Sequence, residues 1–225
     1  MSDALKGRIA VVTGADQPIA QGLGRALGSE GATVVEVEGA WNSREAADTV
    51  FADVRDRFGP VDIVLHAAVP AIAFEPMDLV DVDDERFEAI WERMLRTTIF
   101  LLQAAYPQMQ GRGGRVLFVT PTMSMSGAAG LAPYTAAVEA QRVLIKATAR
   151  QWGPEGITLN SLAPAPEHLP IGMSSTEVSL APSALGGPGD PELDLGPIAV
   201  FLASDAGHFV TGATISADGG VWMAP

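Results

Sequence analysis

Residues 8–27 constrain the possible folds more than any other stretch of the sequence. An apolar run rich in β-branched residues, beginning at Ile9, is followed by a loop that contains Gly14 and then by a segment of Leu, Ala and Arg. This order predicts a strand, a turn and a helix, the opening unit of a nucleotide-binding βαβ fold. Such a unit places a helix N-terminus beside backbone N–H groups, which suits a pyrophosphate.

The same stretch, together with Gly31–Val35, resembles the short-chain dehydrogenase/reductase family, whose loop usually reads TGxxxGxG. In an alignment without gaps Thr13 and Gly14 match, whereas the later glycines of the motif fall on Pro18 and Ala20. Pro18 has no N–H to donate, and Ala20 adds a Cβ where the family backbone passes close to phosphate. The frame of the motif is therefore present, and the residues that would touch phosphate are changed.

A second register of this loop is open, in which Gly22 and Gly24 supply the glycine pair and the loop is about one helical turn longer. It has energetic support, because Gly22, Gly24 and Gly28 inside a helix would each cost about 1 kcal/mol relative to alanine. The ungapped register keeps the family spacing to Gly31, and Pro18 suits a first helical turn. We favour the ungapped register.

Hydrophobic patterning predicts an α/β fold, a single Rossmann-like doubly wound parallel sheet of about six strands in one domain, 1–225. After the first strand, the predicted strands are Thr33–Glu38, Val61–His66, Gly114–Val119, Ile157–Leu162 and Gly212–Ala217. Predicted helices cover about 44–58, 81–109, 133–152 and 190–204, with Asn42 or Ser43 capping the first of these and acidic side chains capping the second.

One βα unit of the family is missing from this chain. The family inserts a helix, an edge strand and another helix between the second strand and the Val61 strand, and this chain has only roughly twenty residues there. The sheet is therefore expected to be smaller on the adenine side. The long irregular stretch 164–189, rich in Pro, Gly and Ser, lies where the family keeps its substrate lid.

The catalytic positions of the family are mostly changed. The resemblance places the family's Tyr at Tyr134, but the Lys four residues later is Val138, which supplies no charge to lower the phenol pKa. The family's Ser falls on Pro121, and its helical Asn falls near Met94. Proton transfer by Tyr134 at neutral pH is therefore expected to be less favourable.

Three side chains are candidate replacements at this end of the sheet. Thr122 or Ser124 could supply the missing hydroxyl if the loop shifts, although a loop hydroxyl usually forms a turn. His66 ends a strand on the ligand side of the sheet and could exchange a proton near neutrality, although a hydrogen-bonded histidine is the simpler interpretation. Glu38 either binds a ribose hydroxyl or faces water, and the sequence leaves both open.

Composition excludes several other functions. A net charge of −13 argues against nucleic acid or an anionic membrane as a partner, and the absence of cysteine removes thiolate chemistry. The three histidines lack metal-ligand spacing, so no metal is expected. The chain shows no signal peptide and no apolar run of membrane-spanning length, which predicts a cytoplasmic protein.

The segments that resemble the family most closely lie near the C-terminus. They are Asn160–Pro164, Phe201–Asp205, Val210–Gly212 and Asp218–Gly220. In the family the last three build the final helix and strand and one of the subunit contacts. Packing and assembly motifs are therefore retained, while those for cofactor and proton transfer are not.

These observations lead to three functional hypotheses. The first is a family member that has lost hydride transfer and binds no cofactor, serving as a non-catalytic or regulatory subunit in a homo-oligomer or beside an active relative. The second is an oxidoreductase acting on a carbonyl or alcohol, with Tyr134 as acid/base and NAD or NADP held by Thr13, Gly14, Gly22, Gly24 and Glu38. The third is a small-ligand binder or lyase that uses His66 and Tyr134.

Overall fold

The computed structural model describes residues 3–38, 41–169 and 181–223. Their strands form one parallel sheet of six strands in the order β2-β1-β3-β4-β5-β6. The strands are β1 (Ile9–Thr13), β2 (Thr33–Val37), β3 (Ile63–His66), β4 (Gly114–Val119), β5 (Ile157–Pro164) and β6 (Thr214–Ala217). The predicted α/β fold with its doubly wound sheet is therefore confirmed.

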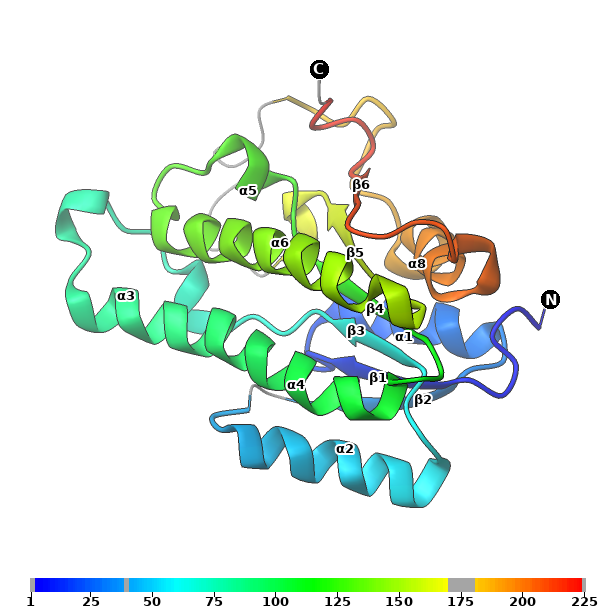
Figure 1. The fold of residues 1–225 in the computed structure, drawn as a ribbon. Coiled ribbons are helices and arrows are strands. Elements are labelled where there is room, and N and C mark those ends of the chain that lie inside the picture. The colour runs from blue at the N-terminus through cyan, green and yellow to red at the C-terminus, as the bar shows by residue number, and fades with distance from the viewer. Residues whose placement is uncertain (1–2, 39–40, 170–180, 224–225) are drawn as a thin grey trace.

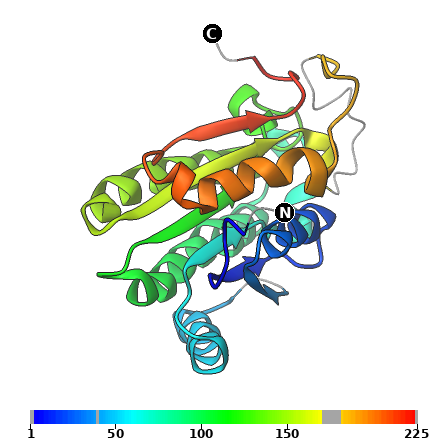
Figure 2. The ribbon, with the colours of Figure 1, turned by 90° about the vertical axis from the view of Figure 1, so that its right-hand side faces the viewer.

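Helices cover both faces of this sheet (Figures 1 and 2). One layer holds α1 (Pro18–Ser29) and α8 (Gly196–Ala203), and the other holds α2 (Arg44–Phe58), α4 (Thr97–Met109) and α6 (Ala132–Trp152). Alternate residues of β1 enter opposite layers, because Val11 packs toward α2 and α4 while Ala10 and Val12 pack toward α1. This period of two explains why the central strands are apolar on both faces.

The long helix predicted over 81–109 is divided into α3 (Asp84–Trp91), a π-helical turn at Glu92–Arg96, and α4. Its start is capped as expected, since Asp83 Oδ1 accepts the N–H of Arg86 at 2.7 Å. A short helix, α5 (Met123–Ser126), follows β4. The C-terminal helix is divided in a similar way, with a π-helical turn at Pro191–Leu195 leading into α8.

A single helix, α2, joins β2 to β3, and it is capped by Ser43, whose Oγ accepts the N–H of Ala46 at 3.1 Å. β2 pairs only with β1 among the described strands, so it forms an edge of the sheet. At this edge the described sheet therefore lacks the extra strand and helix that the resembled family inserts, as the short chain length between β2 and β3 predicts.

The helix α1 begins at Pro18, which is the ungapped register. Gly22 and Gly24 therefore lie inside α1, and the register that would place them in the loop is not the observed one. A Cβ at Gly22 would lie 2.5 Å from the Cβ of Pro191, so this glycine permits α1 to pack against the segment before α8. Close packing of the helix, rather than a loop conformation, accounts for Gly22.

The glycines of α1 should respond in opposite directions to alanine. Gly28→Ala places its Cβ in ordinary contact, 3.7 Å from Val34, and should raise the free energy of unfolding by up to about 1 kcal/mol through helix propensity. Gly22→Ala should lower it, because the clash with Pro191 outweighs that gain. Urea unfolding of both variants measures the difference, and stabilisation by Gly22→Ala would contradict the observed packing of α1.

Candidate functional site

A pocket of about 510 Å³ opens at the carboxyl ends of β1 and β3. The strand order reverses between these two strands, which is the place where doubly wound sheets bind ligands. Its wall includes Asp16 after β1, Trp41 after β2 and Val69 after β3. The π-helical turn contributes Arg93 and Arg96.

Trp41 carries an unsatisfied polar group in this wall. Its indole is buried and meets the ring of Phe51 edge to face, with ring centroids 5.9 Å apart, and its Nε1 has no hydrogen-bond partner within the described ranges. A buried donor without a partner is uncommon, and this one lies in a residue that lines the pocket. Arg96 is held by Glu92 at 2.6 Å, whereas the exposed Arg93 makes no ion pair within the described residues.

Gly14 adopts a positive φ of 80°, and its Cβ position is filled by the backbone after β3. A Cβ there would lie 2.7 Å from the N of Ala68, and the N–H of Gly14 donates to Val37 O at 3.1 Å. The contact with the β3 loop therefore requires glycine, and the neighbouring strand already uses its N–H group. Glu38 follows β2 and is exposed.

His66 is buried at the end of β3 and paired with the end of β1. Its Nδ1 lies 2.7 Å from Thr13 Oγ1, its ring and that of Phe118 meet edge to face, and its Nε2 has no hydrogen-bond partner in the part of the chain that the structure describes. Burial lowers the pKa of His66 to about 4. The side chain is therefore neutral at physiological pH, and the expected hydrogen-bonded histidine is the one observed.

Tyr134, the residue at the family's catalytic position, lies in the interior. Its side chain is 0% exposed in an apolar cluster, its ring contacts Phe74 at a centroid distance of 5.2 Å, and its hydroxyl has no hydrogen-bond partner among the described residues. Burial raises the pKa of the phenol, and the charge of Arg142 opposes this to a smaller extent. The phenol thus retains its proton more strongly than a tyrosine in water.

Val138 and Met94 belong to the same apolar cluster. The positions of the family's Lys and Asn are therefore occupied by side chains that pack against the tyrosine and carry no charge. Around Tyr134, apolar side chains therefore replace the family's Lys and Asn, the polar groups that would assist proton transfer.

Thr122 and Ser124 are both buried and hydrogen bonded. Thr122 Oγ1 donates to Pro164 O at 3.3 Å, and Ser124 Oγ donates to Pro121 O at 2.8 Å. Ser124 Oγ also accepts Nη2 of Arg142 at 2.7 Å. Ser124 is held by its own loop, as the turn-forming alternative predicts, whereas Thr122 is held by the end of β5. Neither hydroxyl is free to polarise a carbonyl in this conformation.

Arg142 is a buried residue that the sequence analysis did not identify. Its guanidinium also donates to Thr120 Oγ1 at 2.9 Å and to Thr214 Oγ1 at 3.2 Å, and its Nε meets Glu139 at 3.0 Å. It ties the loop after β4 to α6 and β6. Its position two helical turns after Tyr134 could have predicted a place on the same side of the helix. The sequence pattern is equally compatible with an exposed arginine.

The third hypothesis required His66 and Tyr134 to share a cleft. The structure gives them separate surroundings, Thr13 and Phe118 for the histidine and Phe74 for the tyrosine. No contact joins the two side chains within the described ranges.

Part of the expected lid, residues 170–180, lies outside the described residues. In the part that follows, Leu185 N–H donates to Gly219 O at 3.0 Å, so this segment packs beside the end of β6. Among the described residues no group of His, Asp or Glu side chains could hold a metal ion, and no helix could span a membrane.

Comparisons with known proteins agree with this architecture. A family model described as enoyl-(acyl carrier protein) reductase matches residues 6–222. L-Rhamnose 1-dehydrogenase (NAD(P)(+)) of Sphingomonas sp. is 32% identical, over 86% of this chain and 78% of that protein. The 2-dehydro-3-deoxy-D-gluconate 5-dehydrogenase of Dickeya dadantii is 26% identical, over 98% and 97%.

The fold is also similar to that of a solved structure. The 3-ketoacyl-(acyl-carrier-protein) reductase of Brucella melitensis complexed with NADH superimposes with a TM-score of 0.85 at 23% identity. The match covers 96% of this chain and 99% of that one.

The buried His66 should make stability depend on pH. Its folded pKa of about 4 lies below the ordinary 6.5, so the unfolded chain binds the proton first and stability falls as pH drops from 6.5 toward 4. The loss should approach roughly 3 kcal/mol. His66→Gln should lack this component, and the exposed His208→Gln should retain it. The free energy of unfolding is measured with urea between pH 7 and 4.5. An equal change with pH in wild type and His66→Gln would contradict the buried neutral state.

Removing the Tyr134 hydroxyl should stabilise the fold. Tyr134→Phe eliminates a buried polar atom without a partner and should raise the free energy of unfolding by about 1 kcal/mol. Tyr106→Phe is the matched control, and it should lower stability because its hydroxyl donates to Glu155 at 2.6 Å. A destabilised Tyr134→Phe would mean that the hydroxyl has a partner in solution.

Proposed function

The chain belongs to the short-chain dehydrogenase/reductase family, and from this premise we propose that it keeps the family fold but does not itself transfer hydride. Its role is that of a non-catalytic or regulatory subunit in an oxidoreductase assembly of the same family. Two parts of the expected dinucleotide cleft support the proposal: the surroundings of Tyr134 and the loop after β1.

The observation that carries this proposal is the environment of Tyr134. A phenol that acts as acid or base must reach the reacting oxygen and must have its pKa lowered toward the working pH. Here the hydroxyl is covered by hydrocarbon, its pKa is raised, and Val138 stands where a cation would lower it. Each of these features opposes proton transfer, and they act at the same atom.

The remaining positions support the same function. Pro121 provides no hydroxyl where the family has Ser, and Ser124 nearby is bound by both Pro121 and Arg142. The loop after β1 has lost an N–H donor at Pro18 and gained a side chain at Ala20, which is buried in α1. Binding of a pyrophosphate at this loop is correspondingly weaker.

A role in an assembly is supported by apolar side chains left on the surface. Phe87 and Trp91 stack on α3 with ring centroids 5.9 Å apart, and Ile99 on α4 and Val143 on α6 are also exposed. Exposed aromatic residues of this kind are enriched in protein interfaces. A copy of this chain or an active relative could cover them.

A second candidate is an NAD(P)-dependent oxidoreductase acting on a carbonyl or alcohol. Two observations favour it: the relatives named above are dehydrogenases, and a pocket of about 510 Å³ lies at the carboxyl ends of β1 and β3. Asp16, Trp41 and Arg93 could hold the adenosine end of such a cofactor, which would supply or accept the hydride. This function requires Tyr134 to become exposed and its proton to leave without a neighbouring lysine.

Titration calorimetry of the purified chain with NAD⁺, NADH, NADP⁺ and NADPH separates the two candidates. The first predicts no binding at micromolar concentrations and no turnover across a panel of carbonyls and alcohols, together with a family subunit recovered on purification from the native cell. The second predicts micromolar binding and turnover that is abolished in Tyr134→Phe but kept in Tyr106→Phe. Micromolar binding of any of the four dinucleotides would overturn the first.

A further inference from the structure

A second pocket, of about 360 Å³, lies at the amino ends of the strands, at the opposite end of the sheet from the site described above. Its charged residues are three arginines and three acids: Arg8, Arg112, Arg115, Asp62, Asp205 and Glu155. They come from the segments that precede β1, β3 and β4, from the start of β4 itself, where Arg115 lies, and from the turns that precede β5 and β6. Only folding brings these charges together.

One arginine of this pocket is fully paired. Arg112 donates to Asp62 Oδ1 at 2.9 Å and to Gln108 O at 2.8 Å. The other oxygen of Asp62 accepts the N–H of Ile9 at 2.9 Å. Asp62 therefore serves mainly to fix the start of β1, and little of its charge is left for the other two arginines.

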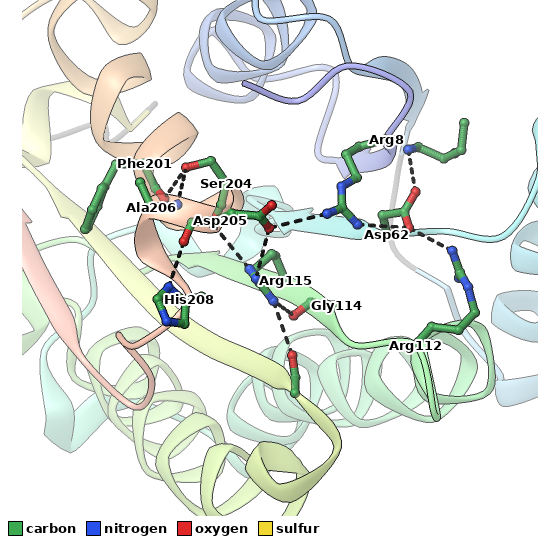
Figure 3. Close-up of polar contacts among 12 residues, drawn as sticks. Arg8, Asp62, Arg112, Gly114, Arg115, Phe201, Ser204, Asp205, Ala206 and His208 are labelled. Atoms are coloured by element: carbon green, nitrogen blue, oxygen red, sulfur yellow. Dashed lines mark hydrogen bonds and ion pairs between the residues drawn. The ribbon is translucent and has the colours of Figure 1, made fainter. Parts of the chain in front are cut away.

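Arg8 and Arg115 are paired loosely. Figure 3 shows the guanidinium of Arg8 between the carboxylates of Asp205 and Asp62, and it lies 3.4 Å from the first and 3.7 Å from the second. Arg115 lies 3.6 Å from the same Asp205. Strong charged pairs have N···O distances of about 2.7–2.9 Å, so both arginines share one distant counter-ion.

That counter-ion is itself exposed. The Asp205 side chain is 83% exposed on the single helical turn Asp205–Gly207, whereas the Arg115 side chain is 14% exposed. Arg115 is otherwise held by carbonyls, with Nη1 donating to Gly114 O at 3.0 Å and to Gly156 O at 3.2 Å. A partly buried cation is thus fixed in place, while its carboxylate can move into water.

The remaining acid does not neutralise the pair. Glu155 accepts the Tyr106 hydroxyl, and it forms no ion pair with any arginine of the described residues. Burial lowers the pKa of Arg115, Asp205 raises it by less, and the neighbouring charge of Arg8 lowers it further. The centre of this pocket therefore holds two guanidinium groups whose shared acid, Asp205, is exposed and lies 3.4 Å from Arg8 and 3.6 Å from Arg115.

We propose that this pocket binds a small phosphate anion between the guanidinium groups of Arg8 and Arg115, displacing the carboxylate of Asp205. Two arginines converging on one point suit the tetrahedral oxygens of phosphate, which accept several N–H groups at once. The source is either inorganic phosphate or the phosphate group of a small phosphomonoester. This site is independent of the dinucleotide cleft and of the function proposed for it.

Thermal unfolding and titration calorimetry with sodium phosphate, and separately with glycerol 3-phosphate, test this site against sodium chloride of equal ionic strength. Phosphate should raise the melting temperature more than chloride does, because only the folded state has the pocket. Tighter binding of glycerol 3-phosphate would identify a phosphomonoester as the ligand, and equal or weaker binding would identify the free anion.

Variants with opposite expected effects distinguish a ligand site from a structural ion network. Asp205→Asn removes the competing carboxylate and should tighten phosphate binding several-fold. Arg8→Gln and Arg115→Gln should each weaken it by about tenfold or more, the usual cost of losing a charged hydrogen bond. Arg57→Gln is the control for net charge, because Arg57 is exposed on α2 and pairs with Asp53 there.

The half-exposed Arg8 can be replaced with little effect on packing, so a folding defect in Arg115→Gln leaves the test intact. The proposal is overturned if phosphate stabilises neither wild type nor Asp205→Asn beyond chloride. It is also overturned if Arg57→Gln weakens phosphate binding as much as Arg8→Gln, since the effect would then be one of overall charge.

Discussion

Burial of the central strands on both faces is the constraint on which the rest of this structure depends. Strands β1, β3, β4 and β5 are packed between two helical layers and are buried along almost their whole length, so the few polar side chains on them, such as Asn160, are buried as well. A parallel sheet also requires a crossover after every strand, so the loops gather at its two ends. Polar chemistry is thereby confined to these ends, where backbone groups and charged side chains can meet water.

The two ends have different chemistry in this chain. At the carboxyl ends, the wall around Tyr134 is apolar, and the nearby polar groups bind one another, as in the network of Arg142, Ser124 and Thr120. At the amino ends, Arg8 and Arg115 share a single exposed carboxylate. The loosely paired arginines Arg8 and Arg115 thus lie away from the family's reaction site, whereas the pocket next to that site is lined by Arg93, which forms no ion pair within the described residues.

Family membership and residue chemistry bear on different parts of the function. Similarity over nearly the whole chain shows the family and its fold, and the relatives named above are dehydrogenases. Hydride transfer additionally needs a phenol that can exchange its proton, and the surroundings of Tyr134 oppose that exchange. Family membership thus follows from the whole chain, whereas hydride transfer depends on a few side chains on α6 and its neighbours.

The sequence by itself determined the strand and helix order, the capping of one helix by Asn42 or Ser43 and of the next by an acidic side chain, and the shortened connection between β2 and β3. These depend on periodicity, caps and spacing, which are local properties of the chain. The sequence favoured the start of α1 at Pro18 over a second register, and the structure decided between them. Only the tertiary structure decided the burial of Tyr134, the pairing of His66 with Thr13 and the meeting of Arg8 with Asp205. Such contacts join residues far apart in sequence, 53 positions for the histidine pair and 197 for Arg8 and Asp205. No local pattern encodes them, because each depends on how whole helices and strands pack.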